Sequence, residues 1–169
     1  STEASGDNST AMGLQTEASG DGSVAMGANT TASGNYSTAL NNTTQASASS
    51  SFASGLATTA SGEASTAMGS QTTASGKFST AMGQLSTADG EVSVAIGYAN
   101  IASGEQAQAY GSNAEASGDN SFAFGTFSTT TASGAGSFSF GEDNESKEVG
   151  SFTMGALNIV DGSGSFAIG

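Results

Sequence analysis

The chain of 169 residues contains no cysteine, histidine, tryptophan or proline. Without cysteine there is no disulfide scaffold and no thiolate chemistry. Without histidine there is neither imidazole catalysis nor a zinc site built on Cys and His ligands. Basic side chains are also scarce, because two lysines stand against fifteen acidic residues and the net charge is −13. This charge argues against a nucleic acid or an anionic membrane surface as the partner.

Long apolar segments are missing as well. No apolar run approaches the ~20 residues of a membrane-spanning helix, and no signal sequence opens the chain, so we expect these residues not to be inserted in a membrane. Charged residues make up only 10% of the chain, while serine, threonine, alanine and glycine supply 105 residues. This composition is typical of either a low-complexity disordered chain or a repeat architecture. The order of the residues decides between the two.

Two sequence marks recur with a period of 14 residues. The tripeptide Ala-Ser-Gly begins at Ala4, Ala18, Ala32, Ala60, Ala74, Ala102 and Ala116. A large apolar residue followed by glycine recurs in the same phase, as in Met12-Gly13, Met26-Gly27 and Ile96-Gly97. The consensus, A-S-G-x-x-S-x-A-h-G-x-x-T-x with h a large apolar residue, continues through twelve copies. A disordered chain has no reason to keep this phase, so the sequence predicts a solenoid.

A 14-residue repeat suits two short strands joined by two tight turns. We therefore predict an all-β parallel solenoid of about twelve coils, forming one domain over 1–169 with irregular repeats around 40–55, 126–131 and 142–150. Glycine adopts positive φ angles without steric cost, so the glycines of the second mark are expected at the turns. These predicted turn glycines are Gly13, Gly27, Gly69, Gly83, Gly97, Gly111, Gly125, Gly141 and Gly155.

Small residues are predicted to fill the interior. Side chains alternate along a strand, so Ser and Ala of S-x-A-h-G share one face, and x and h share the other. Two strands that close within 14 residues leave room only for small side chains between them. The threonines two residues before each Ala of A-S-G are expected to point inward and to hydrogen-bond along the ladder. The alternative places the large residues inside and the alanines outside.

The large residues then form an outer stripe, which is too extensive for an isolated monomer and should be buried against copies of the same chain. The predicted interface residues are Met12, Val24, Met26, Leu40, Met68, Met82, Val94, Ile96, Tyr110, Phe122, Phe124, Phe138, Phe140, Phe152, Met154, Phe166 and Ile168.

The segments Ser23–Gly27, Ser93–Gly97 and Ser165–Gly169, which recur within the 14-residue repeat with A-S-G between them, resemble the YadA-like head of trimeric autotransporter adhesins. The resemblance extends over essentially the whole chain. It implies a left-handed parallel β-roll, packed as a homotrimer and displayed outside a Gram-negative bacterium by an outer-membrane anchor that these residues do not contain. It further implies non-catalytic binding to host matrix proteins such as collagen, fibronectin or laminin, or to other cells or surfaces, with no cofactor.

Two other classes of function deserve a test against this interpretation. An acidic column, formed by Asp7, Asp21, Glu63, Glu91, Glu105 and Asp119, offers oxygen ligands of the kind that Ca²⁺ takes, but a solvated edge explains it as well. Outward threonines such as Thr31, Thr59 and Thr73 would suit an ice-binding or surface-binding solenoid, although acidic residues and Gln45 interrupt them. A structural spacer without a ligand is the remaining alternative. A regular solenoid offers no cleft for paired catalytic carboxylates, so we expect no enzyme.

Irregular segments are where recognition is expected on a uniform scaffold. One is the insertion at 126–131, and the other is the acidic stretch at 142–148. The predicted ligand-contact residues are Thr126, Phe127, Thr129, Glu142, Asp143, Glu145 and Lys147.

Overall fold

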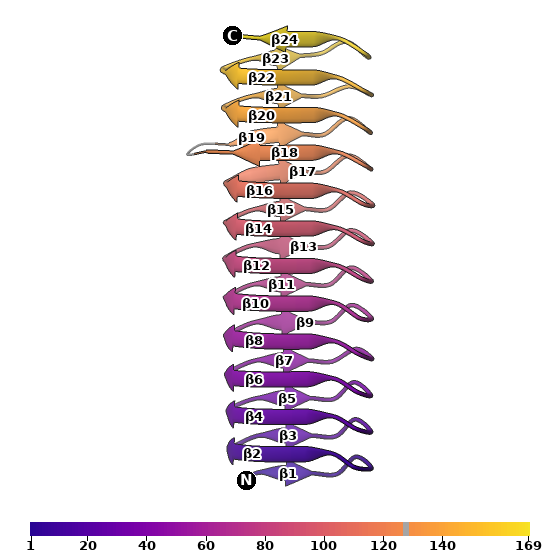
Figure 1. Cartoon of the computed structure of the whole chain (residues 1–169), viewed down its shortest axis with the longest axis vertical. Coiled ribbons are helices and arrows are strands. Elements are labelled where there is room, and N and C mark those ends of the chain that lie inside the picture. The colour runs from indigo at the N-terminus through magenta and orange to yellow at the C-terminus, as the bar shows by residue number, and fades with distance from the viewer. Residues whose placement is uncertain (127–128) are drawn as a thin grey trace. The chain divides into compact units, whose positions relative to one another are not determined.

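The computed structural model describes residues 1–126 and 129–169, which form two compact units: unit 1 (Ser1–Leu85) and unit 2 (Ser86–Gly169). In each unit a long and a short strand alternate along the chain. Long strands pair with long strands and short with short, so each unit has two parallel sheets (Figure 1). None of the described residues forms a helix that could cross a membrane.

The long strands of unit 1 are β2 (Thr10–Leu14), β4 (Val24–Ala28), β6 (Thr38–Asn42), β8 (Phe52–Leu56), β10 (Thr66–Ser70) and β12 (Thr80–Gln84). Its short strands are β1 (Glu3–Ala4), β3 (Glu17–Ala18), β5 (Thr31–Ala32), β7 (Gln45–Ala46), β9 (Thr59–Ala60) and β11 (Thr73–Ala74).

The long strands of unit 2 are β14 (Val94–Tyr98), β16 (Gln108–Ser112), β18 (Phe122–Gly125), β20 (Phe138–Glu142), β22 (Phe152–Ala156) and β24 (Phe166–Ile168). Its short strands are β13 (Thr87–Ala88), β15 (Ile101–Ala102), β17 (Ala114–Ala116), β19 (Thr130–Ala132), β21 (Glu145–Ser146) and β23 (Ile159–Val160).

The strand register follows the repeat. In unit 1, Thr66 of β10 lies beside Thr80 of β12, fourteen residues later. In unit 2 the offset becomes sixteen where Ala114 of β17 pairs with Thr130 of β19. The two extra positions therefore lie in the connection between β18 and β19, and pairing resumes beyond them. The predicted all-β parallel solenoid with a 14-residue repeat and about twelve turns is confirmed.

The interior of each unit consists of small side chains from both sheets. Ala67 and Ala109 on long strands, Ala60 and Ala102 on short strands, and Ser65 are all completely buried. Side chains of this size let the two sheets approach closely. The equivalent position of each neighbouring turn carries a side chain of similar size. The prediction of a small-residue core is confirmed, and the alternative with large residues inside is wrong.

The inward threonines differ from expectation in one respect. Thr16, Thr30, Thr44, Thr58 and Thr72 are buried as predicted, but within the described residues their hydroxyls have no hydrogen-bond partner. The strand carbonyls around them already accept backbone N–H groups of the preceding turn, as Thr44 O accepts from Thr31 N at 2.9 Å. At these five positions the ladder is thus held by the backbone. Two other threonines of the column do form the expected hydrogen bonds, because Thr2 Oγ1 donates to Gly13 O at 2.6 Å and Thr130 Oγ1 donates to Gly141 O at 2.8 Å.

The predicted turn glycines do not lie at turns. Gly13 lies inside β2 and Gly69 inside β10, with φ angles of 125° and 119°. A Cβ at Gly69 would collide with the carbonyl oxygen of Gly83 in the next turn, so both the backbone angle and the close stacking require glycine there. The same strand position and positive φ recur at Gly27, Gly83, Gly97, Gly111, Gly141 and Gly155, whereas Gly125, the last residue of β18, does not have the positive φ.

Other residues form the tight turns. Asn8, Tyr36 and Val92 precede long strands with φ angles of 57°, 59° and 59°, and Gln15 and Leu85 follow long strands with 53° and 58°. A left-handed conformation costs a side chain about 1–2 kcal/mol. Backbone hydrogen bonds between turns hold two of these residues in place and offset that cost there: Tyr36 N donates to Asp21 O at 2.7 Å, and Leu85 N donates to Ser70 O at 3.0 Å.

Two of the irregular repeats keep the fold through local compensation. At Ala48 and Glu148, which replace the glycine of A-S-G, the carbonyl oxygen accepts a hydrogen bond from the hydroxyl three residues later. Ser51 Oγ lies 2.7 Å from Ala48 O, and Ser151 Oγ lies 2.7 Å from Glu148 O. Asn41 replaces a strand glycine and retains a positive φ of 86°.

Candidate functional site

The outward face of the long-strand sheet carries the predicted interface residues in both units. Met12, Met26, Phe140, Met154, Phe166 and Ile168 are exposed, with between 38% and 64% of their surface accessible. The others are half-buried against their neighbours: Val24, Leu40, Met68, Met82, Val94, Ile96, Tyr110, Phe122, Phe124, Phe138 and Phe152. The register places these side chains in two adjacent columns, which we call the outer stripe. In unit 1 one pair of the stripe is Met68 beside Met82.

The stripe changes its chemistry between the units. In unit 2 the rings of Phe122, Phe138, Phe152 and Phe166 stack on one another, with centroids 4.7–4.9 Å apart and nearly parallel planes. Phe124 and Phe140 stack beside them at 4.9 Å. The equivalent column of unit 1 contains Thr10, Val24, Thr38, Phe52, Thr66 and Thr80. Aromatic pairs contribute about 0.5–1.5 kcal/mol beyond the area they bury, so unit 2 presents the stronger apolar surface.

The predicted ligand-contact segment is partly brought together. Thr129, Asp143 and Glu145 line an open depression of about 260 Å³ with Thr131 and Ile159. Thr126 lies apart from the depression and donates a hydrogen bond from Oγ1 to Gly141 O at 3.4 Å. Phe127 lies outside the described residues, and Glu142 is exposed at the end of β20.

The ammonium group of Lys147 lies beside two acidic neighbours. Its Nζ lies 3.0 Å from Glu145 Oε2 and 3.2 Å from Asp161 Oδ1. Hydrogen bonds to Glu145 and Asp161 raise the pKa of Lys147 above its ordinary value. The ammonium group thus remains charged and partly neutralises the acidic rim of the depression.

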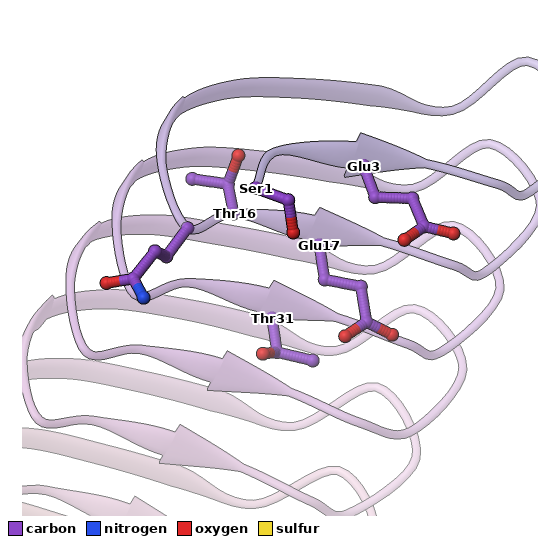
Figure 2. A pocket seen from close by; sticks show the side chains of 6 residues that line it. Ser1, Glu3, Thr16, Glu17 and Thr31 are labelled. Atoms are coloured by element: carbon purple, nitrogen blue, oxygen red, sulfur yellow. The ribbon is translucent and has the colours of Figure 1, made fainter.

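A second depression lies on unit 1, with a volume of about 200 Å³. Ser1, Glu3, Gln15, Thr16, Glu17 and Thr31 line it. Figure 2 shows the side chains of Glu3 and Glu17 one above the other on the outward side of neighbouring short strands, with Thr31 in the next turn. The surface is acidic and hydroxyl-rich.

The acidic column forms part of the turn scaffold. Asp21 Oδ1 accepts a hydrogen bond from Asp7 N at 3.1 Å, and Asp119 Oδ1 accepts one from Glu105 N at 3.0 Å. Lys77 interrupts the column and pairs with Glu63 at 3.0 Å. Among residues 1–126 and 129–169, no group of three or more acidic residues is arranged to hold a metal ion.

Buried asparagines were not anticipated. Asn100 and Asn144 occupy the inward threonine column of unit 2 and are completely buried. Asn100 Nδ2 donates to Ile96 O at 2.7 Å and to Gly111 O at 3.0 Å, and its Oδ1 accepts from Ala114 N at 2.9 Å. The carboxamide therefore clamps one turn to the next. The sequence signal for this clamp was the position of Asn100 in the inward threonine column, fourteen residues after Ser86 and fourteen before Ala114.

The sequence model of the YadA head domain repeat, which comprises two copies of the repeat, matches residues 4–30, 18–40, 46–72, 60–86, 74–100, 88–114 and 102–128. The starting points of these matches differ by 14 residues or, between 18 and 46, by twice that period, and together the matches cover well over half of the chain. A search of the curated proteins found no match.

Proposed function

Because the chain belongs to the YadA head domain repeat family, we propose that it is the head of a surface adhesin that works as a homotrimer of left-handed β-rolls. The head binds without catalysis, and no cofactor takes part. An outer-membrane anchor elsewhere in the protein would display it on a Gram-negative cell. The observation that carries this proposal is the outer stripe, because its methionine and phenylalanine side chains have no covering segment within the described residues.

Three-fold closure explains the stripe physically. Each long-strand sheet has one face in the small-residue core and one apolar face outside, so only other copies can cover the second face throughout. Closed symmetry covers it on every chain without growth into a fibre. The short-strand sheets, with Glu3, Glu17, Thr31 and Thr59 pointing outward, then remain in water and are available for contacts.

Light scattering in dilute buffer tests the assembly. We expect a mass about three times the 16.2 kDa of the chain. Thr66→Lys places a charge on the outer stripe and should dissociate the trimer. Thr59→Lys is the matched control, because Thr59 is also half-buried and outward-facing but belongs to the short-strand sheet. A wild-type monomer, or dissociation by both variants alike, would overturn the proposed packing.

Adhesion is tested with immobilised collagen, fibronectin and laminin. Three weak sites on one trimer raise avidity without new contacts, so the wild type should bind and the Thr66→Lys monomer should bind much more weakly. Thermal hysteresis by the same protein without adhesion would instead favour ice binding through the outward threonines, and neither activity would favour a spacer.

The ligand-contact residues proposed are those of the insertion and of the acidic stretch, namely Thr126, Phe127, Thr129, Glu142, Asp143, Glu145 and Lys147. Glu142→Gln with Asp143→Asn removes two exposed charges and leaves the Lys147 ion pairs in place. Glu3→Gln with Glu17→Gln removes two charges from unit 1 as the control. If the Glu142→Gln, Asp143→Asn variant binds all three matrix proteins as well as the wild type does, this assignment is contradicted.

A further inference from the structure

The asparagines of unit 1 share a feature that adhesive packing does not use. All five, Asn8, Asn29, Asn35, Asn41 and Asn42, are followed two residues later by serine or threonine. The pattern Asn-x-Ser/Thr, with x other than proline, is the acceptor motif for asparagine-linked sugars. Unit 2 also has five asparagines, Asn100, Asn113, Asn120, Asn144 and Asn158, of which Asn144 alone has the motif.

Exposure separates the two groups. The five motif asparagines of unit 1 are all exposed. Asn144 is completely buried, and its Nδ2 donates to Phe140 O at 2.8 Å and to Gly155 O at 2.7 Å. A sugar on Asn144 would replace one of the two N–H donors of Nδ2 and would have no space inside the core. Every motif that the fold leaves accessible therefore lies in the first three turns of unit 1.

Asn8 and Asn29 have the most open carboxamides. They occupy the two kinds of tight turn, with φ angles of 57° and 55°. Within residues 1–126 and 129–169, neither side-chain amide forms a hydrogen bond. In contrast, Asn35 Oδ1 accepts from Asp21 N at 3.1 Å, and Asn42 Oδ1 accepts from Thr43 Oγ1 at 2.7 Å.

The hydroxyls of the motif are accessible at the same two sites. Thr10 is exposed, and Thr31 is half-buried on the outward side of β5. At Asn35 and Asn42 the corresponding hydroxyls belong to Ser37 and Thr44, which are buried in the core. At Asn41 the hydroxyl of Thr43 is exposed, but it donates to Asn42 Oδ1 at 2.7 Å, and Asn41 Nδ2 donates to Ser54 Oγ at 3.5 Å. Asn8 and Asn29 combine an accessible hydroxyl with an unbonded carboxamide and are thus the two leading acceptor sites.

Unit 2 repeats both turns without the hydroxyl. Asn120 occupies the turn position of Asn8 with the same φ of 57°, but Phe122 stands where Thr10 would be. Asn113 has a φ of 56°, beside 55° for Asn29, but Glu115 stands in place of Thr31. Asn120 is exposed like Asn8 and is therefore a matched control, in which the backbone is kept and the acceptor motif is lost. Asn113 is half-buried and its Nδ2 donates to Ser112 Oγ at 3.3 Å, so it matches Asn29 in its backbone alone.

We propose that unit 1 carries asparagine-linked sugar, at Asn8 and Asn29 first, transferred from a nucleoside diphosphate hexose. In the transfer, Asn Nδ2 bonds to the anomeric carbon of the hexose and loses one proton to a base of the transferase. The bond between that carbon and the diphosphate oxygen breaks, and the nucleoside diphosphate leaves with the electron pair. Neither asparagine belongs to the outer stripe, so sugar and self-association use different surfaces.

Peptide mapping by mass spectrometry, with fragmentation that preserves the sugar bond, tests the proposal on protein isolated from the cells that display it. We expect hexose on Asn8 and Asn29 and unmodified Asn113, Asn120 and Asn144. Native protein in which Asn8 and Asn29 carry no sugar would overturn the proposal. Because the readout is a peptide mass, it does not depend on whether the chain assembles.

Two variants made in the same cells decide whether the motif is responsible. Thr31→Val keeps the shape of the side chain and removes the hydroxyl, so Asn29 should lose its sugar while Asn8 keeps it. Phe122→Thr supplies the missing hydroxyl, so the exposed Asn120 should gain a sugar. Modification of Asn29 that survives Thr31→Val would contradict recognition through this motif.

Discussion

Unit 1 and unit 2 have the same backbone repeat and the same inward alanine and serine columns, but they differ in the outer stripe and in the inward threonine column. Unit 1 places threonine, valine and methionine on its outer stripe, and unpaired threonine hydroxyls inside. Unit 2 places stacked phenylalanines outside and clamps its interior with Asn100 and Asn144. Both fold into six turns of paired strands. The fold is therefore specified by the small inward residues and the strand glycines, while the outer columns are left to vary with function.

The largest loss of stability is expected from substitutions in the inward alanine column, which the two units share. Ala67→Leu in unit 1 and Ala109→Leu in unit 2 each insert a branched side chain between sheets that have no space for it, and should lower the free energy of unfolding by about 3 kcal/mol. Urea unfolding at fixed protein concentration measures this. Thr66→Leu, one residue away and outward, is the control and should change stability by less than about 0.5 kcal/mol. Equal losses at positions 66 and 67 would refute the assignment of the inward face.

A smaller loss of stability is expected from substitutions in the inward threonine column, where the interiors of the two units differ. Asn100→Thr gives unit 2 the residue found in unit 1 and leaves Ala114 N without its acceptor, so it should cost about 2 kcal/mol. The matched change in unit 1, Thr58→Val, removes a buried hydroxyl that has no partner, and should be neutral or stabilising. Hydrogen exchange at Ala114 reports the first change locally. Similar costs for the two variants would mean that the carboxamide clamp contributes no more than the hydroxyl.

Much of the fold was predictable from periodicity. The phase of Ala-Ser-Gly and the alternation within S-x-A-h-G determine which residues face inward, because steric exclusion at Ala67 or Ser65 acts through side-chain size alone. The tight turns were not predictable in the same way. Leu85 and Tyr36 are poor candidates for positive φ, and they adopt it because hydrogen bonds between turns outweigh the local cost. The conformational preference of single residues therefore predicted glycines at the turns. The close stacking of neighbouring turns instead requires those glycines inside the long strands.

The candidate site was predictable to a lesser extent. The outer stripe follows from alternation, so its residues could be named before the structure. The clamps at Asn100 and Asn144 could not, because a single polar residue in a threonine column does not reveal which backbone groups it will reach. The contrast between Asn8 and Asn144 likewise depends on burial, which the motif Asn-x-Ser/Thr does not encode.

The smallest of these effects concerns the outer stripe itself. Phe138→Thr removes a ring that stacks on Phe122 at 4.8 Å and on Phe152 at 4.9 Å, and should cost about 1–2 kcal/mol in urea unfolding. Thr66→Phe adds a ring beside Phe52 in unit 1 and should recover about 0.5–1 kcal/mol. If the stacks matter only when copies pack together, both shifts should shrink in dilute protein that light scattering shows to be monomeric. Shifts that persist in the monomer would show instead that the aromatic column stabilises each roll from within, and that unit 2 is the more stable half of the chain before any partner is present.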